Sequence, residues 1–197
     1  MPRASAQAKE ETRQRLLRAA ARGFRTRGYG GLAVDAVAEE AGVTSGAFYA
    51  HFGSKAAMFQ AALAEGLGQL RDGLGIFQRR NGSQWLRKFA TWYLSAERRA
   101  DLAGSCALPT LSLEAARSDD ETREAYDEQL RAIVKAFQAG LEGSHREEQA
   151  LAILALLSGG LSMAHAVHDQ RLGARIAHAV INAVSVLGDS FPRPDRK

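Results

Sequence analysis

Proline is the feature that most limits what this chain can fold into. The four prolines stand at positions 2, 109, 192 and 194, so two long stretches carry none. Alanine supplies 37 residues and leucine 22, whereas valine, isoleucine and threonine together supply 19. Strong helix formers with few β-branched residues favour helices, and no long alternation of apolar and polar residues indicates a strand. The sequence therefore predicts an all-α protein of about nine helices.

The spacing of apolar residues gives approximate bounds for these helices. Gly28 is predicted to end the first helix, Gly42 to end the second, and Pro109 to lie in the first turn of a short middle helix. The predicted ranges are 9–27, 34–41, 44–51, 55 to beyond 70, 83–100, a short helix from about 109, 119–141, 146–168 and 172–187.

The net charge of +4 is carried by the first 60 residues. Residues 1–27 hold eight basic and two acidic side chains, whereas residues 61–197 hold 17 of each sign. Such an asymmetry indicates a basic head that binds a polyanion and a neutral body with another role.

Several protein classes do not fit this composition. A single cysteine excludes an internal disulfide framework and suits a reducing compartment. The longest apolar run, residues 150–157, is too short to cross a membrane, and the first residues form no apolar signal segment. We therefore expect a cytoplasmic protein with no membrane partner. Glycine-rich phosphate loops, HExxH sequences and nucleophile elbows are not found, so we expect neither an enzyme nor a cofactor.

Residues 34–52 carry the most informative motif, in which two short predicted helices flank an Ala-Gly-Val-Thr turn. Gly42 permits the positive φ of a sharp turn, Val43 fills the junction and Thr44 caps the second helix. This arrangement is typical of a helix-turn-helix, whose second helix enters the major groove of DNA. The competing interpretation is an ordinary corner between two helices, which does not account for the basic helix before it.

A longer string of residues surrounds this turn. It comprises Gly23-Phe24, Gly28-Tyr29 and the run Val37-Ala38-Glu39-Glu40-Ala41-Gly42-Val43-Thr44-Ser45-Gly46-Ala47-Phe48-Tyr49-Ala50-His51-Phe52-Gly53-Ser54-Lys55. With its Phe-Tyr-x-His-Phe string and Ser-Lys helix start, the segment resembles the TetR family of bacterial transcriptional regulators over roughly residues 9–65. One departure is that Leu32 and Ala33 stand where the family often has Thr or Ser, which removes a helix cap and a hydroxyl contact to phosphate.

The resemblance implies how the segment would contact a double-stranded operator. Small residues at the start of the second helix let the backbone approach base edges, and Ala47 would touch a thymine methyl group. Tyr49 and His51 match the family's phosphate-contacting pair, and Lys55 matches its phosphate contact at the start of the next helix. The implied DNA-binding residues are Thr44, Ser45, Gly46, Ala47, Tyr49, His51 and Lys55.

Four arginines repeat near helical period in the first predicted helix: Arg15, Arg18, Arg22 and Arg25. They either flank DNA phosphates or form a solvated face. In both cases their summed charge makes DNA binding dependent on salt.

One helix-turn-helix contacts half of a palindromic site, so specific binding requires a homodimer. We expect a DNA-binding domain over residues 1–55, a ligand-binding and dimerisation domain over 56–189, and a flexible tail over 190–197. TetR-type regulators commonly pair through their last two helices. The predicted dimer residues are Leu157, Leu161, Ile176, Val180, Val184 and Leu187, although the same pattern also suits intrachain core.

The middle helices are the candidates for an effector pocket. Few charges lie in them, so we expect an apolar or aromatic small molecule, or none. The candidate ligand-binding residues are Phe89, Trp92, Tyr93, Cys106, Leu111, Phe137 and Met163, which would otherwise be plain core.

Cys106 follows two arginines, whose charge would lower the pKa of its thiol and suit a sensor of oxidants or electrophiles. The alternative is a small buried hydrophobe. His165 and His168 lie three residues apart, but no third ligand at metal spacing is evident. Interface histidines are the favoured interpretation, and no metal is predicted.

Together these features predict a ligand-responsive transcriptional repressor. It would bind a palindromic operator as a dimer and leave it when a small effector binds or Cys106 is modified. The alternative is a DNA-binding structural or cell-organisation protein with the same head and no inducer, which a sealed core would favour.

Overall fold

The computed structural model describes residues 2–189, which form ten α-helices and one 3-10 helix and contain no strand. The predicted all-α class is therefore confirmed, while the predicted tail, 190–197, lies outside the described residues. The elements are α1 Pro2–Gly31, α2 Val34–Glu40, α3 Ser45–Phe52, α4 Lys55–Asn81, η1 Gly82–Gln84, α5 Trp85–Tyr93, α6 Ala96–Ala100, α7 Ala107–Ala116, α8 Asp120–Gln138, α9 Arg146–Ala166 and α10 Gln170–Asp189.

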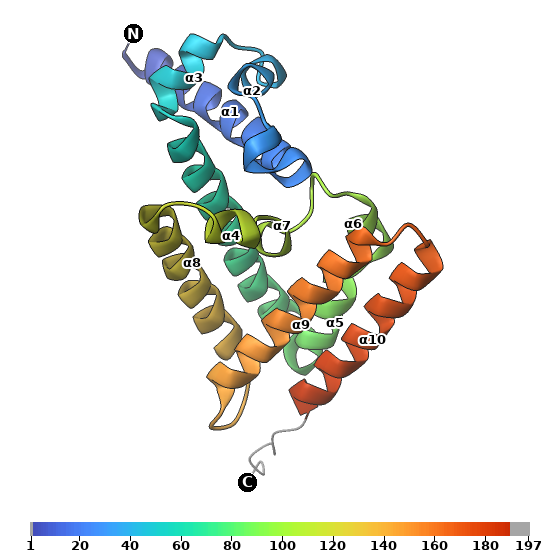
Figure 1. Ribbon diagram of the computed structural model, residues 1–197. Helices are drawn as coiled ribbons and strands as arrows, with labels where there is room; N and C mark the ends of the chain where they lie inside the picture. The colour runs from blue at the N-terminus through green and yellow to red at the C-terminus, as the bar shows by residue number, and fades with distance from the viewer. Residues whose placement is uncertain (1, 190–197) are drawn as a thin grey trace.

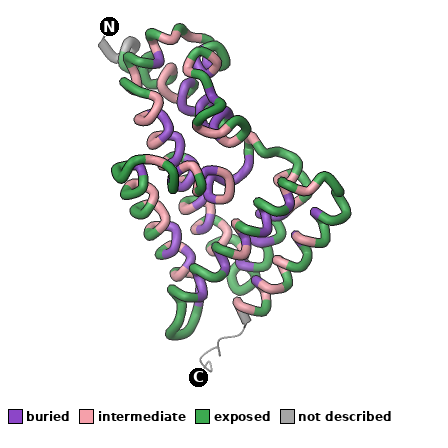
Figure 2. The backbone as a smooth tube through the Cα atoms, in the orientation of Figure 1, coloured by how far each residue is buried: buried purple, intermediate pink, exposed green. Residues whose placement is uncertain are grey.

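The helices form a small head and a larger body that share one long helix (Figure 1). Helices α1, α2 and α3 make the head, and α4 runs from the head into the body. In the body α4 packs on α8, while α9 and α10 pack side by side and α5 lies against α10. Buried backbone follows α4 and the inner sides of α1 and α9 (Figure 2).

Several predicted helix bounds differ from the structure. The first helix, predicted from residue 9, begins at Pro2. The segment predicted as one helix from Ser83 to Ala100 breaks after Tyr93, because the Ser95 side chain accepts a hydrogen bond from the backbone N–H of Arg98 and caps a new helix. Serine competes with helix continuation in this way. Helix α7 begins at Ala107, slightly before the predicted start, so Pro109 still lies in its first turn, where the missing N–H leaves no helical hydrogen bond unmade.

The glycine break near the end of α1 is confirmed. Gly28 has φ 69° and ψ 175°, and only three residues of the segment follow it. The left-handed φ suits glycine. A Cβ there would also lie 2.8 Å from a carboxylate oxygen of Glu114 in α7, so the break sits where head and body meet.

Helix α9 is long and apolar enough to cross a membrane by length and composition alone, with a mean hydropathy of 1.4. This corrects the expectation that no segment reaches membrane length. In the fold, Ile153, Leu157 and Leu161 are buried in the body core, as in the central helix of a globular domain.

The close passage of α4 over α7 gives the first prediction. A Cβ at Gly66 would lie 2.6 Å from the Cβ of Ala107, whereas a Cβ at Gly73, in the same helix, meets no described atom within 4 Å. We expect Gly66→Ala to lower the free energy of unfolding by about 1–3 kcal/mol through overpacking. Gly73→Ala should raise it by about 0.5–1 kcal/mol through helix propensity. Urea unfolding of both variants tests this, and equal effects would contradict the close passage.

The start of α2 gives the second prediction. Its N-cap is Ala33, which has extended backbone angles and no side-chain oxygen, so the predicted loss of a cap is confirmed. We expect Ala33→Ser to raise the free energy of unfolding by about 0.5–1 kcal/mol, because the hydroxyl would accept a backbone N–H of the first turn. Ala33→Val lacks this oxygen and is the control. A gain in both variants would show that capping is not the cause.

Candidate functional site

The turn between α2 and α3 has the geometry of a helix-turn-helix. Gly42 adopts φ 68°, and the N–H of Val43 donates to the carbonyl of Ala38 at 2.9 Å, which closes the turn. The Thr44 hydroxyl accepts the N–H of Ala47 at 3.3 Å and so caps α3 as predicted. Ala38 and Phe48 are buried between the helices, which fixes α3 against α2.

The first turn of α3 faces away from this core. Thr44 and Gly46 are exposed, and Ser45 and Ala47 are half-buried. The Ser45 hydroxyl donates to a carboxylate oxygen of Asp35 in α2, which holds this side chain against the neighbouring helix. Small side chains on an exposed helix start leave room for close approach to a nucleic-acid groove.

The three predicted phosphate contacts follow that turn along the chain. Tyr49 is 53% exposed, and His51 is half-buried next to Phe52. Lys55 begins α4, and its ammonium lies 4.8 Å from the centre of the Tyr29 ring, a cation–π contact. Tyr29 in turn packs on Phe59 of α4, so the Tyr29 ring, held in the head core, positions the Lys55 ammonium.

The arginines of α1 divide into two sets. Arg15, Arg18 and Arg22 are exposed, and Arg22 forms an exposed ion pair with Glu40 at 3.4 Å. Arg25 instead turns toward the body, where its Nη1 donates to the carbonyl of Ala103 at 3.2 Å. The helical period predicted one common face for the four arginines. Of the four, Arg25 is the one that the body covers.

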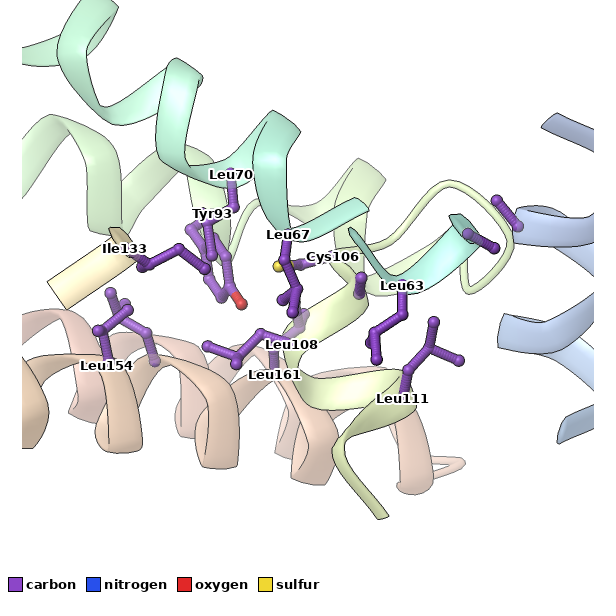
Figure 3. Close-up of a cluster of buried hydrophobic side chains, with 14 of the residues drawn as sticks. Leu63, Leu67, Leu70, Tyr93, Cys106, Leu108, Leu111, Ile133, Leu154 and Leu161 are labelled. Atoms are coloured by element: carbon purple, nitrogen blue, oxygen red, sulfur yellow. The ribbon is translucent and has the colours of Figure 1, made fainter. Parts of the chain in front are cut away.

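The predicted effector residues do not form one pocket. Phe89, Leu111 and Phe137 are core residues with at most 1% exposure, and Met163 is 59% exposed on the outside of α9. Figure 3 shows the buried cluster in which Tyr93 and Cys106 meet leucines of α4, α7 and α9. Trp92, Tyr93 and Cys106 do line a common cavity of about 150 Å³ between head and body.

This cavity is more polar than the sequence suggests. Besides the three predicted residues, it is lined by Arg25 of α1, Arg98 of α6, Gly66, Gln69 and Leu70 of α4, and the segment Gly104, Ser105 and Ala107. The guanidinium carbon of Arg98 lies 3.6 Å from the centre of the Trp92 ring. Arg98 is one of the two arginines expected to act on the Cys106 thiol, but Arg25 was missed in this role. No local pattern shows that residues about 70 positions apart converge.

The ionisable groups of the cavity are strongly affected by burial. Burial raises the pKa of the Cys106 thiol, and the neighbouring Tyr93, Arg25 and Arg98 oppose this shift. Burial, with a contribution from Cys106, also raises the pKa of Tyr93 well above its ordinary range. At neutral pH the thiol therefore stays protonated, which disfavours a thiolate ready to react.

The remaining predicted residues lie on α9 and α10. Leu157, Leu161 and Val184 are buried within the chain, and Ile176, Val180 and Leu187 are half-buried. A different set is exposed: Ala152, Ala155, Gly159 and Met163 on α9, and Leu172, Ala179, Asn182 and Val186 on α10. We call these residues the outer stripes. The members on α9, and Ala179, Asn182 and Val186 on α10, are three or four residues apart, and this spacing was the signal that could have found them.

His165 and His168 do not act together. The Nε2 of His165 lies 2.9 Å from the Ser105 hydroxyl, whereas His168 is exposed. Burial lowers the pKa of His165, opposed by a hydrogen bond with the Arg99 backbone and by the charge of Asp101. Among the described residues, no three His, Cys, Asp or Glu side chains gather as a metal site.

Comparison with known proteins supports the assignment of the head. Residues 16–62 match the family model of bacterial regulatory proteins of the tetR family. A segment of 64 residues is 45% identical to the HTH-type transcriptional regulator SrpR of Pseudomonas putida and covers 32% of this chain and 30% of SrpR. A segment of the same length is 44% identical to the uncharacterized HTH-type transcriptional regulator TtgW, also of Pseudomonas putida, and covers 32% and 48% of the two chains. The matches thus span less than half of either relative's length.

Solved structures extend the similarity in fold to the body. A TetR-family transcriptional regulator from Cytophaga hutchinsonii has a TM-score of 0.77 at 18% identity, over 92% of this chain and 97% of that one. Reduced NemR of E. coli has a TM-score of 0.75 at 20% identity, over 89% and 96%. FadR of Bacillus subtilis in complex with stearoyl-CoA has a TM-score of 0.68 at 16% identity, over 91% and 99%. The head therefore matches the tetR family of bacterial regulatory proteins over residues 16–62, and the whole described chain shares its fold with solved TetR-family regulators.

Proposed function

We propose that the protein is a homodimeric transcriptional repressor that binds a palindromic operator and is released by a small effector. The observation that carries this proposal is the exposed first turn of α3, set next to a basic α1. Base edges would meet Thr44 to Ala47, while Tyr49, His51 and Lys55 would contact phosphates. Such a protein acts in the cytoplasm, where DNA and effector are both available.

The outer stripes of α9 and α10 support the dimer. Exposed alanines and Gly159 keep these surfaces flat, so a second copy can approach closely. Exposed Met163 and Leu172 add apolar area that is solvated in a single chain. Two copies joined here would present two heads to the half-sites of one operator.

The cavity between head and body supports the effector response. A ligand there would touch α1 of the head and α6 of the body, so it can favour one head orientation over another. A coupling of about 1–3 kcal/mol is typical of such a switch. FadR, which shares the fold, is described in complex with stearoyl-CoA, which is consistent with ligand binding in this architecture. Modification of Cys106, which lines the same cavity, would act on the same contacts but must first overcome burial of the thiol.

A structural DNA-binding protein without an inducer remains the second candidate. The observation that favours it is the tight aromatic core, in which Phe89 and Phe137 pack edge to face at 5.7 Å. Two results would support this second candidate. The affinity for DNA would not change with any effector tested, and the protein would bind along DNA without a defined site.

The DNA-binding proposal predicts a specific salt dependence. Selection from random duplexes with the full chain should enrich an inverted repeat. Lys55→Gln should reduce the slope of log affinity against log salt by about 1 per protomer, because one phosphate contact is lost. Lys88→Gln, at an exposed lysine of α5, is the control and should leave the slope unchanged. Failure to enrich a repeat, or equal slopes in both variants, would contradict the proposed interface.

The dimer proposal predicts a monomeric variant. Ala179→Arg places a charge in the outer stripe of α10 and should raise the dimer dissociation constant at least about 100-fold, because an unpaired charge would be buried. Ala116→Arg changes an exposed alanine of α7 and is the matched control. Sedimentation equilibrium measures both. A dimer that tolerates Ala179→Arg pairs through another surface.

A further inference from the structure

Two partly buried guanidinium groups share the cavity without a carboxylate partner. Among the described side chains, neither Arg25 nor Arg98 has a carboxylate oxygen within ion-pair distance of 4.0 Å. The Nε of Arg25 is buried and has no hydrogen-bond partner. The guanidinium of Arg98 lies over the ring of Trp92, and no described side chain forms an ion pair with it. Charges withdrawn from water are ordinarily paired in proteins, so two unpaired cations in one cavity require an explanation.

The nearest acidic residue does not supply the missing partner. Asp101 influences both arginines electrostatically, but its carboxylate accepts the N–H of Gly104 at 2.9 Å and lies beyond ion-pair distance of either guanidinium. Asp101 is also exposed, so solvent screens its charge. Burial lowers the pKa of both arginines, as expected for cations removed from water without a counter-charge.

We propose that this cavity binds a small organic monocarboxylate, with the carboxylate between Arg25 and Arg98. This assignment rests on the proposed function, because it names the chemical class of the effector. Arginine donors match a carboxylate in geometry and charge. The volume of about 150 Å³ is below that of ordinary drug-sized sites, so the ligand is small. Leu70, Tyr93 and Ala107 provide an apolar wall for its hydrocarbon part.

The position of the two arginines explains how such a ligand would act on the head. Arg25 belongs to α1, and Arg98 belongs to α6 in the body. A Cβ at Gly66 would lie 3.0 Å from Nη2 of Arg25, so the bare glycine of α4 gives this side chain room beside the cavity. A carboxylate that draws Arg25 toward Arg98 competes with its hydrogen bond to Ala103, one of the contacts between α1 and the body. Ligand charge is thereby linked to head position.

Calorimetric titration of the full chain without DNA tests the site. The probes are benzoate and propionate as carboxylates, and benzamide as the neutral match of benzoate. We expect benzoate to bind at least about tenfold more tightly than benzamide, because hydrogen bonds to a charged group are the stronger ones. Equal affinity for benzoate and benzamide, or no binding of either carboxylate, would overturn the assignment.

Variants locate the site. Arg98→Gln should weaken benzoate about 10- to 100-fold and leave benzamide unchanged. Arg87→Gln, at an exposed arginine of α5, is the control and should bind like the unchanged chain. Circular dichroism checks that each variant is folded. If Arg98→Gln does not fold, Arg25→Gln is measured in its place. An unchanged benzoate affinity in a folded variant would refute the role of the arginine pair.

The single cysteine gives an independent readout. Because Cys106 lines the cavity, bound benzoate should slow its labelling by N-ethylmaleimide several-fold, and benzamide should not. Labelling at the same rate with and without benzoate would place any bound benzoate elsewhere and refute the site.

Operator binding separates the two proposals. If a carboxylate binds but does not change the affinity for the operator, the effector role is refuted and the carboxylate site is retained. If the protein binds its operator specifically but binds no carboxylate, the carboxylate site is refuted and the proposed DNA-binding regulator is retained.

Discussion

The rest of the structure depends on α4, whose buried face belongs to two domains at once. Met58 and Phe59 lie in the core of the head, and Leu67 and Leu74 lie in the core of the body. One continuous hydrophobic cluster therefore runs from α1 to α10. The boundary expected near residue 55 does not separate two cores. Any rotation of the head must shift α4 against α7, where Gly66 leaves no spare room.

The cavity changes what the body is expected to recognise. Aromatic and apolar residues in the middle helices suggested an apolar effector. Phe89, Leu111 and Phe137 instead pack in the core, where they leave little room for a ligand. The cavity that Trp92 and Cys106 do line lies where α1, α4, α5 and α6 meet, and its chemistry is set by cations. A recognition site between domains is formed by tertiary contacts, so the composition of any single helix describes it poorly.

Local features of the sequence predicted the head well, because its geometry depends on neighbouring residues. Gly42, Thr44 and Ser54 adopt the turn and cap roles that their chemistry favours. The arginines of α1 show the limit of such reasoning. Arg18 and Arg25 share a helix and a period, yet one is exposed and the other is covered by the body, which no helical pattern reveals. The outer stripes were missed for a different reason, because apolar residues marked the covered side of α9 and α10.

The solitary thiol in the cavity limits the redox chemistry available to these 197 residues. A sulfenic acid formed on Cys106 would find no second cysteine among these residues to convert it to a disulfide. Reversal would depend on a small thiol that can enter a narrow space, or on a cysteine of another molecule. Without either, further oxidation leads to sulfinic acid, an anion fixed between two arginines. Damage to this one sulfur would then imitate a permanently bound acidic ligand.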